Sequence, residues 1–327
     1  MEIIVYGAGA NGHSVFELLN ERYIGDYDVK GFADSDRTGF FCGLPICKRE
    51  EIPQGSRVII AVHNFEDAAE ICASLKTMGI QDIWWFETTR TILGRSFFDE
   101  QCVDCTAWNG IMLKQAEMHV MDACNLNCRG CTHFSPVFSR KIPSLRERIN
   151  DVKKLKTKFS HIAIFYILGG EPFLNPEIGE YARSIREILP DSDLRIVTNG
   201  LLIPNLTDDI LRKIHDHSVH VSISEYVPTH KIIDKICSRL NTFDIVYDIR
   251  KIDNKQKFNI PLAKHSDMGY SRRCMSDGCV TIWNGSIARC PTLMYVGVLN
   301  QKFNVNFPQD GIISLDSDVS GEVLKDK

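Results

Sequence analysis

The sequence lacks the features that would direct it to a membrane, to secretion or to nucleic acid. No apolar run approaches the length that spans a bilayer. The N-terminal strand, residues 2–6, shows neither a basic lead nor a cleavage-site pattern, so we expect no signal peptide. The formal net charge of −4 disfavours a broad nucleic-acid surface, which is normally basic. We therefore expect a cytoplasmic protein with neither a membrane partner nor a nucleic-acid partner.

Cysteine, by contrast, is frequent, and three of the 12 cysteines form a C-x3-C-x2-C triplet at Cys124, Cys128 and Cys131. Three thiolates at this spacing can hold one face of an iron–sulfur cube, for which four cysteine ligands are usual. A set of three leaves one iron free to bind and reduce a small molecule. Because cluster ligation requires reduced thiolates, a reducing compartment fits these cysteines better than disulfides do.

A structural zinc site is the alternative for the triplet. Zinc sites usually combine a C-x2-C pair with a second such pair or with a histidine pair. Cys128 and Cys131 match half of that pattern, whereas the spacing of Cys124 fits it poorly. Zinc would also leave a glycine-rich turn at residues 169–172 unexplained, so we favour the iron–sulfur cluster.

Three predicted strands downstream of the triplet end in glycine or polar residues. The strands span residues 164–168, 194–198 and 219–225. The residues at or after their ends are Gly169, Gly170, Glu171, Pro172, Asn199, Ser222 and Ser224. Glycine lets the backbone approach a ligand closely, and parallel barrels build their active sites at the C-terminal ends of strands. We expect one site here; the alternative is that these polar residues only solvate the strand ends.

The triplet and the Gly-Gly-Glu-Pro turn resemble, in order and spacing, the radical S-adenosylmethionine (SAM) superfamily over about residues 112–249. The resemblance implies that Cys124, Cys128 and Cys131 hold a 4Fe–4S cluster whose open iron chelates the methionine moiety of SAM. It also implies that one electron from the cluster cleaves SAM to methionine and a 5′-deoxyadenosyl radical. The electron donor would be a protein such as flavodoxin or ferredoxin.

The same resemblance assigns the contacts to SAM. It places the amino group of SAM at the turn of residues 169–172. The residues expected to contact the SAM ribose are Ser222, Ser224 and, to a lesser degree, Asn199. In this family the residue before the third cysteine is often aromatic and packs near the adenine, whereas here it is Gly130. We expect Phe134 to supply that contact instead.

Residues 113–262 alternate predicted strands with predicted helices, which implies parallel strands joined by right-handed crossovers. We expect a strand over residues 243–249 and helices over residues 145–158, 177–189, 208–217 and 231–240. The family resemblance makes this region a partial (β/α)6 barrel that is open on one side for a substrate.

The first 95 residues form a separate predicted α/β unit of Rossmann-like type. Its first strand leads into a G-x-G-x-x-G turn at Gly7, Gly9 and Gly12, and a later strand ends at Asp34. This context fits nucleotide binding, with the glycine turn and the helix N-terminus toward phosphate and the acid toward a ribose. The alternatives are NAD-linked hydride transfer, for which no second signature is visible, and a packing turn in a domain without a ligand.

The same unit resembles the small Rossmann-like domain at the front of bacterial sugar O- and N-acetyltransferases. The matching stretches are residues 6–9, 31–34 and 43–46. The resemblance implies a nucleotide-linked sugar as the ligand. A linker follows over residues 96–112, and we interpret its C-x2-C pair, Cys102 and Cys105, as two incidental thiols because no partner pair lies nearby.

Residues 263–327 contain the last three cysteines, Cys274, Cys279 and Cys290. A hairpin that turns at Asn284-Gly285 would bring Cys279 and Cys290 to neighbouring positions. The spacing resembles the opening of the SPASM and twitch domains of radical SAM enzymes, which implies an auxiliary 4Fe–4S cluster. In that family further ligands follow, whereas no cysteine follows Cys290 here, and Cys274 is the one available third ligand. We therefore expect one cluster in this chain and two in a longer version; the alternative is a pair of ordinary thiols.

The sequence thus predicts an α/β chain with a Rossmann-like domain at residues 1–95, a partial radical SAM barrel at 113–262 and a small β-hairpin module at 263–327. We expect a radical SAM enzyme, an oxidoreductase or an isomerase, that starts radical chemistry on a small-molecule substrate. The front domain favours a nucleotide-linked sugar or a surface-polysaccharide precursor. A peptide-modifying maturase and a non-catalytic, metal-stabilised scaffold protein are the alternatives, and the sequence selects no net reaction.

Overall fold

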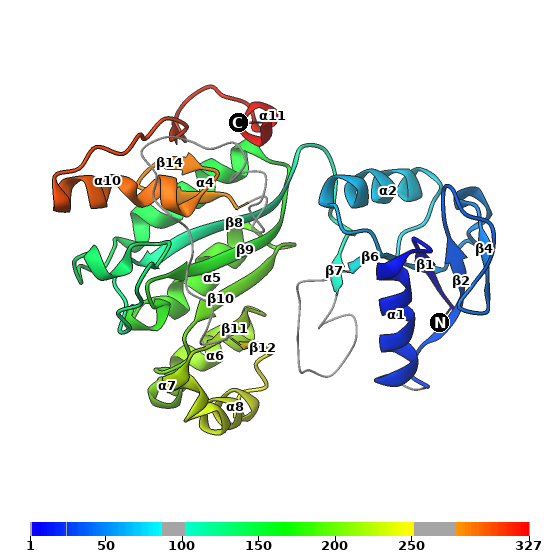
Figure 1. Ribbon diagram of the computed structural model, residues 1–327, viewed down its shortest axis with the longest axis horizontal. Coiled ribbons are helices and arrows are strands. Elements are labelled where there is room, and N and C mark those ends of the chain that lie inside the picture. Colours follow the sequence, from blue (N-terminus) through cyan, green and yellow to red (C-terminus); the bar gives the residue numbers. More distant parts are fainter. Residues whose placement is uncertain (1, 24, 87–101, 252–278, 327) are drawn as a thin grey trace. The chain divides into compact units, whose positions relative to one another are not determined.

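The computed structural model describes residues 2–23, 25–86, 102–251 and 279–326, so Cys274 lies outside the described residues. The chain divides into two compact units, Met1–Asn109 and Gly110–Lys327 (Figure 1). The division falls within the segment expected to be a linker, although residues 102–104 of that segment form a strand of the first unit. In the described part of the chain, no helix combines the length and the apolar character needed to cross a membrane.

The first unit is built on a seven-stranded sheet with the order β3-β4-β2-β1-β5-β6-β7. Strands β4, β2, β1, β5 and β6 are parallel to their neighbours, and the edge strands β3 and β7 pair antiparallel. The elements in chain order are β1 (Glu2–Tyr6), α1 (Ala10–Glu21), β2 (Asp28–Ala33), β3 (Gly39–Phe41), β4 (Leu44–Cys47), β5 (Arg57–Ile60), α2 (Phe65–Thr77), β6 (Ile83–Phe86) and β7 (Cys102–Asp104). The glycine motif therefore lies between β1 and α1, as the sequence predicts.

The second unit is built on an eight-stranded sheet with the order β12-β11-β10-β9-β8-β13-β14-β15. Strands β8 to β13 are parallel to their neighbours, and β14 and β15 are antiparallel. The strands are β8 (Met112–Met121), β9 (His161–Gly169), β10 (Asp193–Thr198), β11 (His220–Glu225), β12 (Tyr247–Lys251), β13 (Thr281–Trp283), β14 (Ser286–Ala288) and β15 (Ile313–Ser314). The helices are α4 (Leu145–Lys158), α5 (Ile178–Ile188), α6 (Asp208–Asp216), α7 (Val227–His230), α8 (Ile233–Thr242), α10 (Pro291–Phe303) and α11 (Gly321–Asp326). The α/β class is confirmed, and the run of parallel strands is that of a partial barrel.

One predicted strand begins later than expected. The sequence predicts a strand over residues 243–249, whereas β12 begins at Tyr247. The chain first leaves α8 through Asp244, which has a left-handed φ of 54°, and the N–H of Ile245 donates back to the Leu240 carbonyl. Residues 243–245 therefore end a helix, and Phe243 and Ile245 are apolar because they pack in the core of this unit.

The C-terminal hairpin is part of the large sheet. Its strand β13 pairs with β8, with Thr281 opposite Glu117. Ile282 and Ile287 of the hairpin belong to the same hydrophobic core as the strands β8 to β11. The sequence predicts a small separate module here. It gives no sign of the pairing with β8, because that pairing joins residues that lie far apart in the chain.

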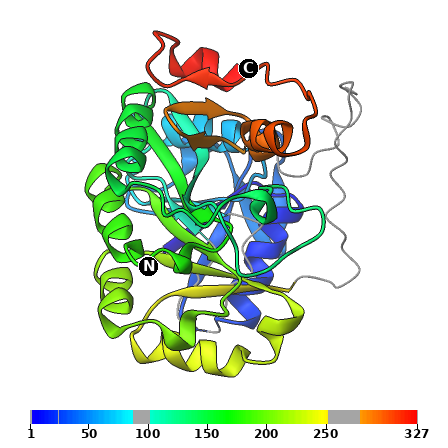
Figure 2. The same cartoon turned by 90° about the vertical axis from the view of Figure 1, so that its left-hand side faces the viewer.

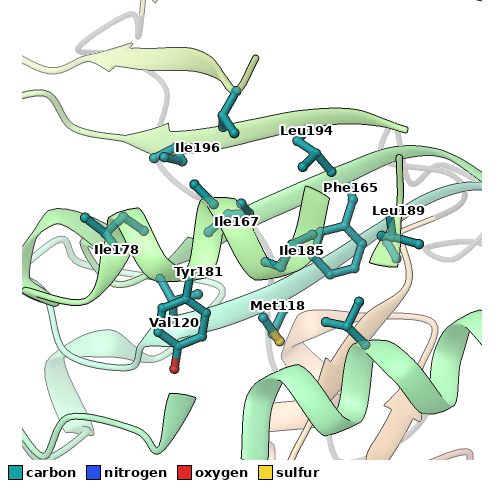
Figure 3. Packing of buried hydrophobic residues seen from close by; sticks show 14 of the residues in the cluster. Met118, Val120, Phe165, Ile167, Ile178, Tyr181, Ile185, Leu189, Leu194 and Ile196 are labelled. Carbon is teal, nitrogen blue, oxygen red and sulfur yellow. The ribbon is translucent and has the colours of Figure 1, made fainter. Parts of the chain in front are cut away.

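Helices α4, α5, α6 and α8 lie along one face of the sheet of the second unit (Figures 1 and 2). Figure 3 shows that alternate strand residues pack on α5; they are Met118 and Val120 of β8, Phe165 and Ile167 of β9, and Leu194 and Ile196 of β10. Because side chains alternate along a strand, the intervening residues face the other side of the sheet. Glu117, His119, Tyr166 and Arg195 therefore share that second face.

Arg186 of α5 connects the C-terminal ends of two helices to the loops that follow them. Its half-buried guanidinium donates hydrogen bonds to the backbone carbonyls of Leu189, Pro190, Ser192, His217 and Ser218. Carbonyls at helix C-termini lack partners within the helix, and the five donors of a guanidinium can serve several of them at once. Arg186 thus joins the loop after α5 to the loop after α6.

We predict that Arg186→Lys lowers the free energy of unfolding by about 2–3 kcal/mol, because an ammonium with three donors leaves several of these carbonyls unpaired. Arg183→Lys is the matched control, since Arg183 lies on the same helix and forms exposed ion pairs with Glu180 and Glu187. It should leave the free energy of unfolding close to that of the wild type, because exposed ion pairs contribute little. Urea unfolding of the two variants measures the difference, and equal losses would show that the carbonyl hydrogen bonds of Arg186 do not stabilise the fold.

Candidate functional site

The three cysteines of the triplet lie in one loop that begins after β8. Their thiols are half-buried and free. Burial raises the pKa of Cys124 to about 11, and Glu171, Cys128 and Cys131 contribute to the same shift. Burial and the neighbouring Cys131 also raise the pKa of Cys128. Cys128 and Cys131 therefore lie within electrostatic range of Cys124, and the loop gathers the three thiols into one group.

The geometry of this group bears on which metal it fits. Within the described ranges, no three His, Cys, Asp or Glu side chains converge on a point that would hold a single metal ion. A zinc site needs four ligands around one ion. The ligands of an iron–sulfur cube instead bind different irons and surround the cluster. The loop supplies three thiols, which is one fewer than a four-ligand zinc site needs and suits a cube with one open iron.

The Gly-Gly-Glu-Pro turn at the end of β9 lies against the backbone that leads into the cysteine loop. The N–H of Gly170 donates to the Met121 carbonyl at 2.8 Å, and the N–H of Glu171 donates to the Ala123 carbonyl at 3.0 Å. A Cβ atom on Gly169 would lie 2.0 Å from the Met121 oxygen, and one on Gly170 would lie 2.3 Å from the Ala123 carbonyl. Both glycines are therefore required by this close approach, and their contact with SAM stays a prediction.

The Glu171 side chain is fully buried and joins the ends of two strands. Its Oε1 accepts hydrogen bonds from Thr198 Oγ1 at 2.7 Å and from the Phe173 N–H at 3.1 Å, and its Oε2 accepts from the Asn199 N–H at 2.9 Å. Burial raises the pKa of Glu171 to about 7, although these hydrogen bonds act in the opposite direction. The carboxyl group therefore holds the glycine turn against the end of β10.

Asn199 reaches from the end of β10 to the cysteine loop. Its Nδ2 donates to Asn125 Oδ1 at 2.7 Å and lies 3.8 Å from Cys124 Sγ. Its own carbonyl accepts a hydrogen bond from Thr229 Oγ1 at 2.7 Å. The structure therefore places Cys124, Glu171 and Asn199 in one connected group.

Ser222 and Ser224 lie on β11, on the face opposite to the hydrophobic core. Ser222 Oγ donates to Asp248 Oδ1 at 2.5 Å, and His220 Nε2 lies 2.8 Å from the same oxygen. Ser222 is therefore engaged with β12, and the ribose contact of either serine stays a prediction.

Phe134 and Pro172 both lie in short turns. Pro172 is buried and opens the 3-10 turn Pro172–Leu174. Phe134 is half-buried with a φ of 52°, and its ring packs against a cluster of Ala288, Met294 and Tyr295. That ring is engaged with the hairpin and α10, so its contact with adenine stays a prediction.

Tyr226, directly after β11, is a neighbour of the cysteine group that sequence reasoning missed. Burial raises the pKa of Tyr226 to about 12, and the next largest contributions come from Cys128 and Cys131. The phenol therefore lies within electrostatic range of these thiols. The local sequence carries no signal for this proximity, because it depends on where β11 lies in the sheet.

In the first unit, the three glycines of the motif have different surroundings. Gly7 has a φ of 115°, which favours glycine. A Cβ atom on Gly12 would lie 1.9 Å from the Gly7 carbonyl oxygen, so α1 can approach the turn only with glycine there. A Cβ atom on Gly9 would meet no described atom within 4 Å. Packing therefore requires Gly7 and Gly12 but does not require Gly9.

Asp34, which follows β2, braces the same turn. Its Oδ2 accepts from the Ala8 N–H at 2.8 Å, and its Oδ1 accepts from the N–H groups of Asp36 and Arg37 at 2.9 and 3.0 Å. Burial alone would raise the pKa of Asp34, but these hydrogen bonds and the Arg37 charge lower it below its usual value. The sequence suggests a ribose for this acid, and the structure adds a bracing role that sequence reasoning missed.

The C-terminal hairpin turns at Asn284 and Gly285, as predicted, and both residues have the positive φ that such a turn requires. The antiparallel register of β13 and β14 places Cys279 and Cys290 opposite each other just beyond the paired residues. Cys279 and Cys290 are both half-buried, and Gln115 Nε2 donates to Cys279 Sγ at 3.6 Å. The hairpin therefore offers two thiols at one place, and an auxiliary cluster there stays a prediction.

Comparison with known families matches residues 118–265 to the Radical SAM superfamily. A GTP 3′,8-cyclase of Microcystis aeruginosa is 33% identical over 92 residues, which are 27% of this chain and 28% of that protein. The FeMo cofactor biosynthesis protein NifB of Azotobacter vinelandii is 29% identical over 113 residues, which are 31% of this chain and 22% of that protein. The chain thus spans less than a third of the length of these two relatives.

Among solved structures, BtrN in complex with AdoMet and 2-DOIA aligns with a TM-score of 0.37 and 16% identity, over 55% of this chain and 74% of that one. Streptococcus suis SuiB bound to precursor peptide SuiA aligns with a TM-score of 0.37 and 10% identity, over 66% of this chain and 65% of that one. At these scores the likeness is distant. The family match, which spans both the cysteine triplet and the glycine turn, shows that residues 118–265 of this chain form a radical SAM domain, and the cofactors of that domain family are a 4Fe–4S cluster and SAM.

Proposed function

We propose that this chain is a radical SAM enzyme in which Cys124, Cys128 and Cys131 hold a 4Fe–4S cluster. The observation that carries the proposal is that three free thiols gather in one loop and that the Gly-Gly-Glu-Pro turn lies against the backbone that leads into this loop. A bound cationic cluster favours the thiolate form and so overcomes the raised pKa values of Cys124 and Cys128. When bound, the cluster and SAM supply the reductive cleavage that generates a 5′-deoxyadenosyl radical.

The chain's own groups around the triplet would bind SAM and hold the loop. We assign the methionine end of SAM to the turn at residues 169–172. Because the Glu171 carboxyl group already accepts three hydrogen bonds, the backbone carbonyls of the turn would accept those of the SAM amino group. Asn199 would hold the loop through Asn125. A flavodoxin or a ferredoxin would deliver the electron.

The substrate that we propose is a nucleotide-linked sugar or a surface-polysaccharide precursor. Its support lies in the first unit, where Gly9 leaves open space without a packing reason. Helix α1 begins at that point with no side-chain cap and no acidic residue in its first turn. Backbone N–H groups at a helix N-terminus bind phosphate well. The diphosphate of a nucleotide-linked sugar has the charge and size for such a turn.

We predict that Cys124→Ala, Cys128→Ala and Cys131→Ala each abolish the cluster, since each removes one of three thiolates. Anaerobically reconstituted wild type should carry about four irons per chain, whereas each variant should carry almost none and should not cleave SAM. Cys237→Ala, which removes a half-buried thiol from α8, is the matched control. Full iron content in any triplet variant would contradict the assignment, and iron uptake without SAM cleavage in the wild type would favour a scaffold protein.

The hairpin cysteines give a separate prediction. If this chain holds one cube, Cys279→Ala combined with Cys290→Ala should leave the iron content at about four per chain. Iron and sulfide analysis of the reconstituted double variant measures this. A wild type with about eight irons that falls to about four in the double variant would show that the hairpin holds a second cube.

Gly9→Val tests the ligand of the first unit. We expect this variant to fold like the wild type, because a side chain at Gly9 meets open space and its φ of −123° suits valine. It should bind UDP-glucose, used as a probe, about tenfold more weakly or not at all in calorimetry, while SAM cleavage is retained. Gly12→Ala should instead destabilise the unit by about 1–3 kcal/mol through overlap with Gly7. Equal binding by wild type and Gly9→Val would show that the motif serves packing alone.

A further inference from the structure

Three hydrogen-bonded polar side chains, of which one is fully buried, lie beside the cysteine loop and are not explained by the contacts described above. His119 of β8 is fully buried. Its Nδ1 lies 3.0 Å from Asp122 Oδ1, and its Nε2 lies 2.7 Å from His133 Nδ1. His133 is half-buried and belongs to the cysteine loop, two residues after Cys131. The three side chains thus connect the end of β8 to the second half of that loop.

The hydrogen bonds that join Asp122, His119 and His133 all run in the same direction, from His133 toward Asp122. Burial lowers the pKa of His119 to about 4, so its ring is neutral near pH 7 and carries one N–H. The Asp122 carboxylate can only accept, so the His119 Nδ1–H donates to it. The His119 Nε2 therefore accepts from the Nδ1–H of His133. This arrangement also selects the tautomer of His133, because its remaining nitrogen, Nε2, then carries no proton in the neutral ring.

Aromatic and charged neighbours hold these three side chains in place. The Tyr295 ring of α10 stacks on the His119 ring, with ring centroids 4.1 Å apart and an interplanar angle of 20°. The His133 ring also stacks on the His119 ring, with centroids 5.0 Å apart and an interplanar angle of 24°. Arg148 of α4 lies 3.7 Å from Asp122 Oδ2 and donates to Asn284 Oδ1 at 2.5 Å. The position of the loop is thereby tied to α4, to α10 and to the turn of the hairpin.

We propose that Asp122, His119 and His133 form a relay that positions the cysteine loop, so that His119 sets the affinity of the loop for its cluster and the reduction potential of that cluster. This inference rests on the proposed function, since it concerns the same three cysteines. Mutation of the residues that orient the ligands of a metal typically lowers the metal affinity about 10–100-fold. Hydrogen bonding and solvent exposure around a cluster set its potential. His119 and His133 are positioning residues here, because they act through the loop.

The competing explanation is that His119 fills space in the core as an aromatic ring. His119→Phe separates the two, because it keeps a ring for the stacks on Tyr295 and His133 and removes both hydrogen bonds. We expect the apparent iron affinity of the reconstituted variant to fall about 10–100-fold in chelator competition. Its midpoint potential, measured by redox titration, should shift from that of the wild type. In the protein without cluster, the amides of residues 125–134 should exchange hydrogen faster.

Tyr295→Phe is the matched control. Among the described residues, the Tyr295 hydroxyl has no hydrogen-bond partner, so its removal keeps the stack and disturbs no bond of the relay. This variant should match the wild type in potential, iron affinity and amide exchange. His133→Phe removes the shared hydrogen bond from the half-buried side of the relay, and it carries the test if His119→Phe fails to fold. The double variant should be no worse than His119→Phe alone, since His119→Phe already removes the hydrogen bond that His133→Phe removes.

A folded His119→Phe or His133→Phe variant with wild-type iron affinity, midpoint potential and loop exchange would overturn the relay while leaving the proposed function intact. A wild type that takes up no cluster would overturn the proposed function instead. The exchange measurement needs no cofactor, so in that case it still decides whether the relay holds the loop.

Discussion

The second unit depends on one close backbone contact, between the turn after β9 and the segment that follows β8. The carbonyls of Met121 and Ala123 accept hydrogen bonds from the N–H groups of Gly170 and Glu171. No side chain fits at Gly169 or Gly170, because its Cβ atom would overlap that carbonyl backbone. Since β8 and β9 are neighbours in the sheet, this contact determines where the cysteine loop begins. The positions of the thiols that the loop carries follow from it.

Buried polar groups extend this contact to the rest of the site. The Glu171 carboxyl group accepts three hydrogen bonds that join the ends of β9 and β10, and Asn199 continues the connection to Asn125. A buried polar group that lost its partner would be costly in free energy, so a fully bonded network holds one arrangement strongly. The loop is thus braced on both sides, by Asn199 near Cys124 and by His133 beyond Cys131. A preorganised ligand set of this kind suits a cofactor site.

In the first unit, the glycines of the G-x-G-x-x-G motif are required for two different physical reasons, close packing and backbone conformation. Gly12 is required because α1 approaches the Gly7 carbonyl, and Gly7 is required by its backbone conformation. Gly9 has neither reason, so packing and backbone conformation do not account for its missing side chain. Asp34 stabilises the same turn through three backbone N–H groups. A pattern match alone assigns Gly7, Gly9, Gly12 and Asp34 to a ligand. The contacts show instead that Gly7, Gly12 and Asp34 support the turn itself, whereas Gly9 does not.

The sequence by itself determined the features that depend on neighbours along the chain. These are the α/β class, the helix over residues 145–158, the hairpin at Asn284-Gly285 and the spacing of the triplet, because periodicity, turn chemistry and ligand spacing act over a few residues. The tertiary structure alone decided the rest: the pairing of β13 with β8, the proximity of Tyr226 to the thiols, and the hydrogen bonds that make His119 more than a packed ring. These contacts join residues that the chain separates by up to about 160 positions, as in the Thr281–Glu117 hydrogen bond. No local pattern encodes them, because they exist only once the core has set the order of the strands.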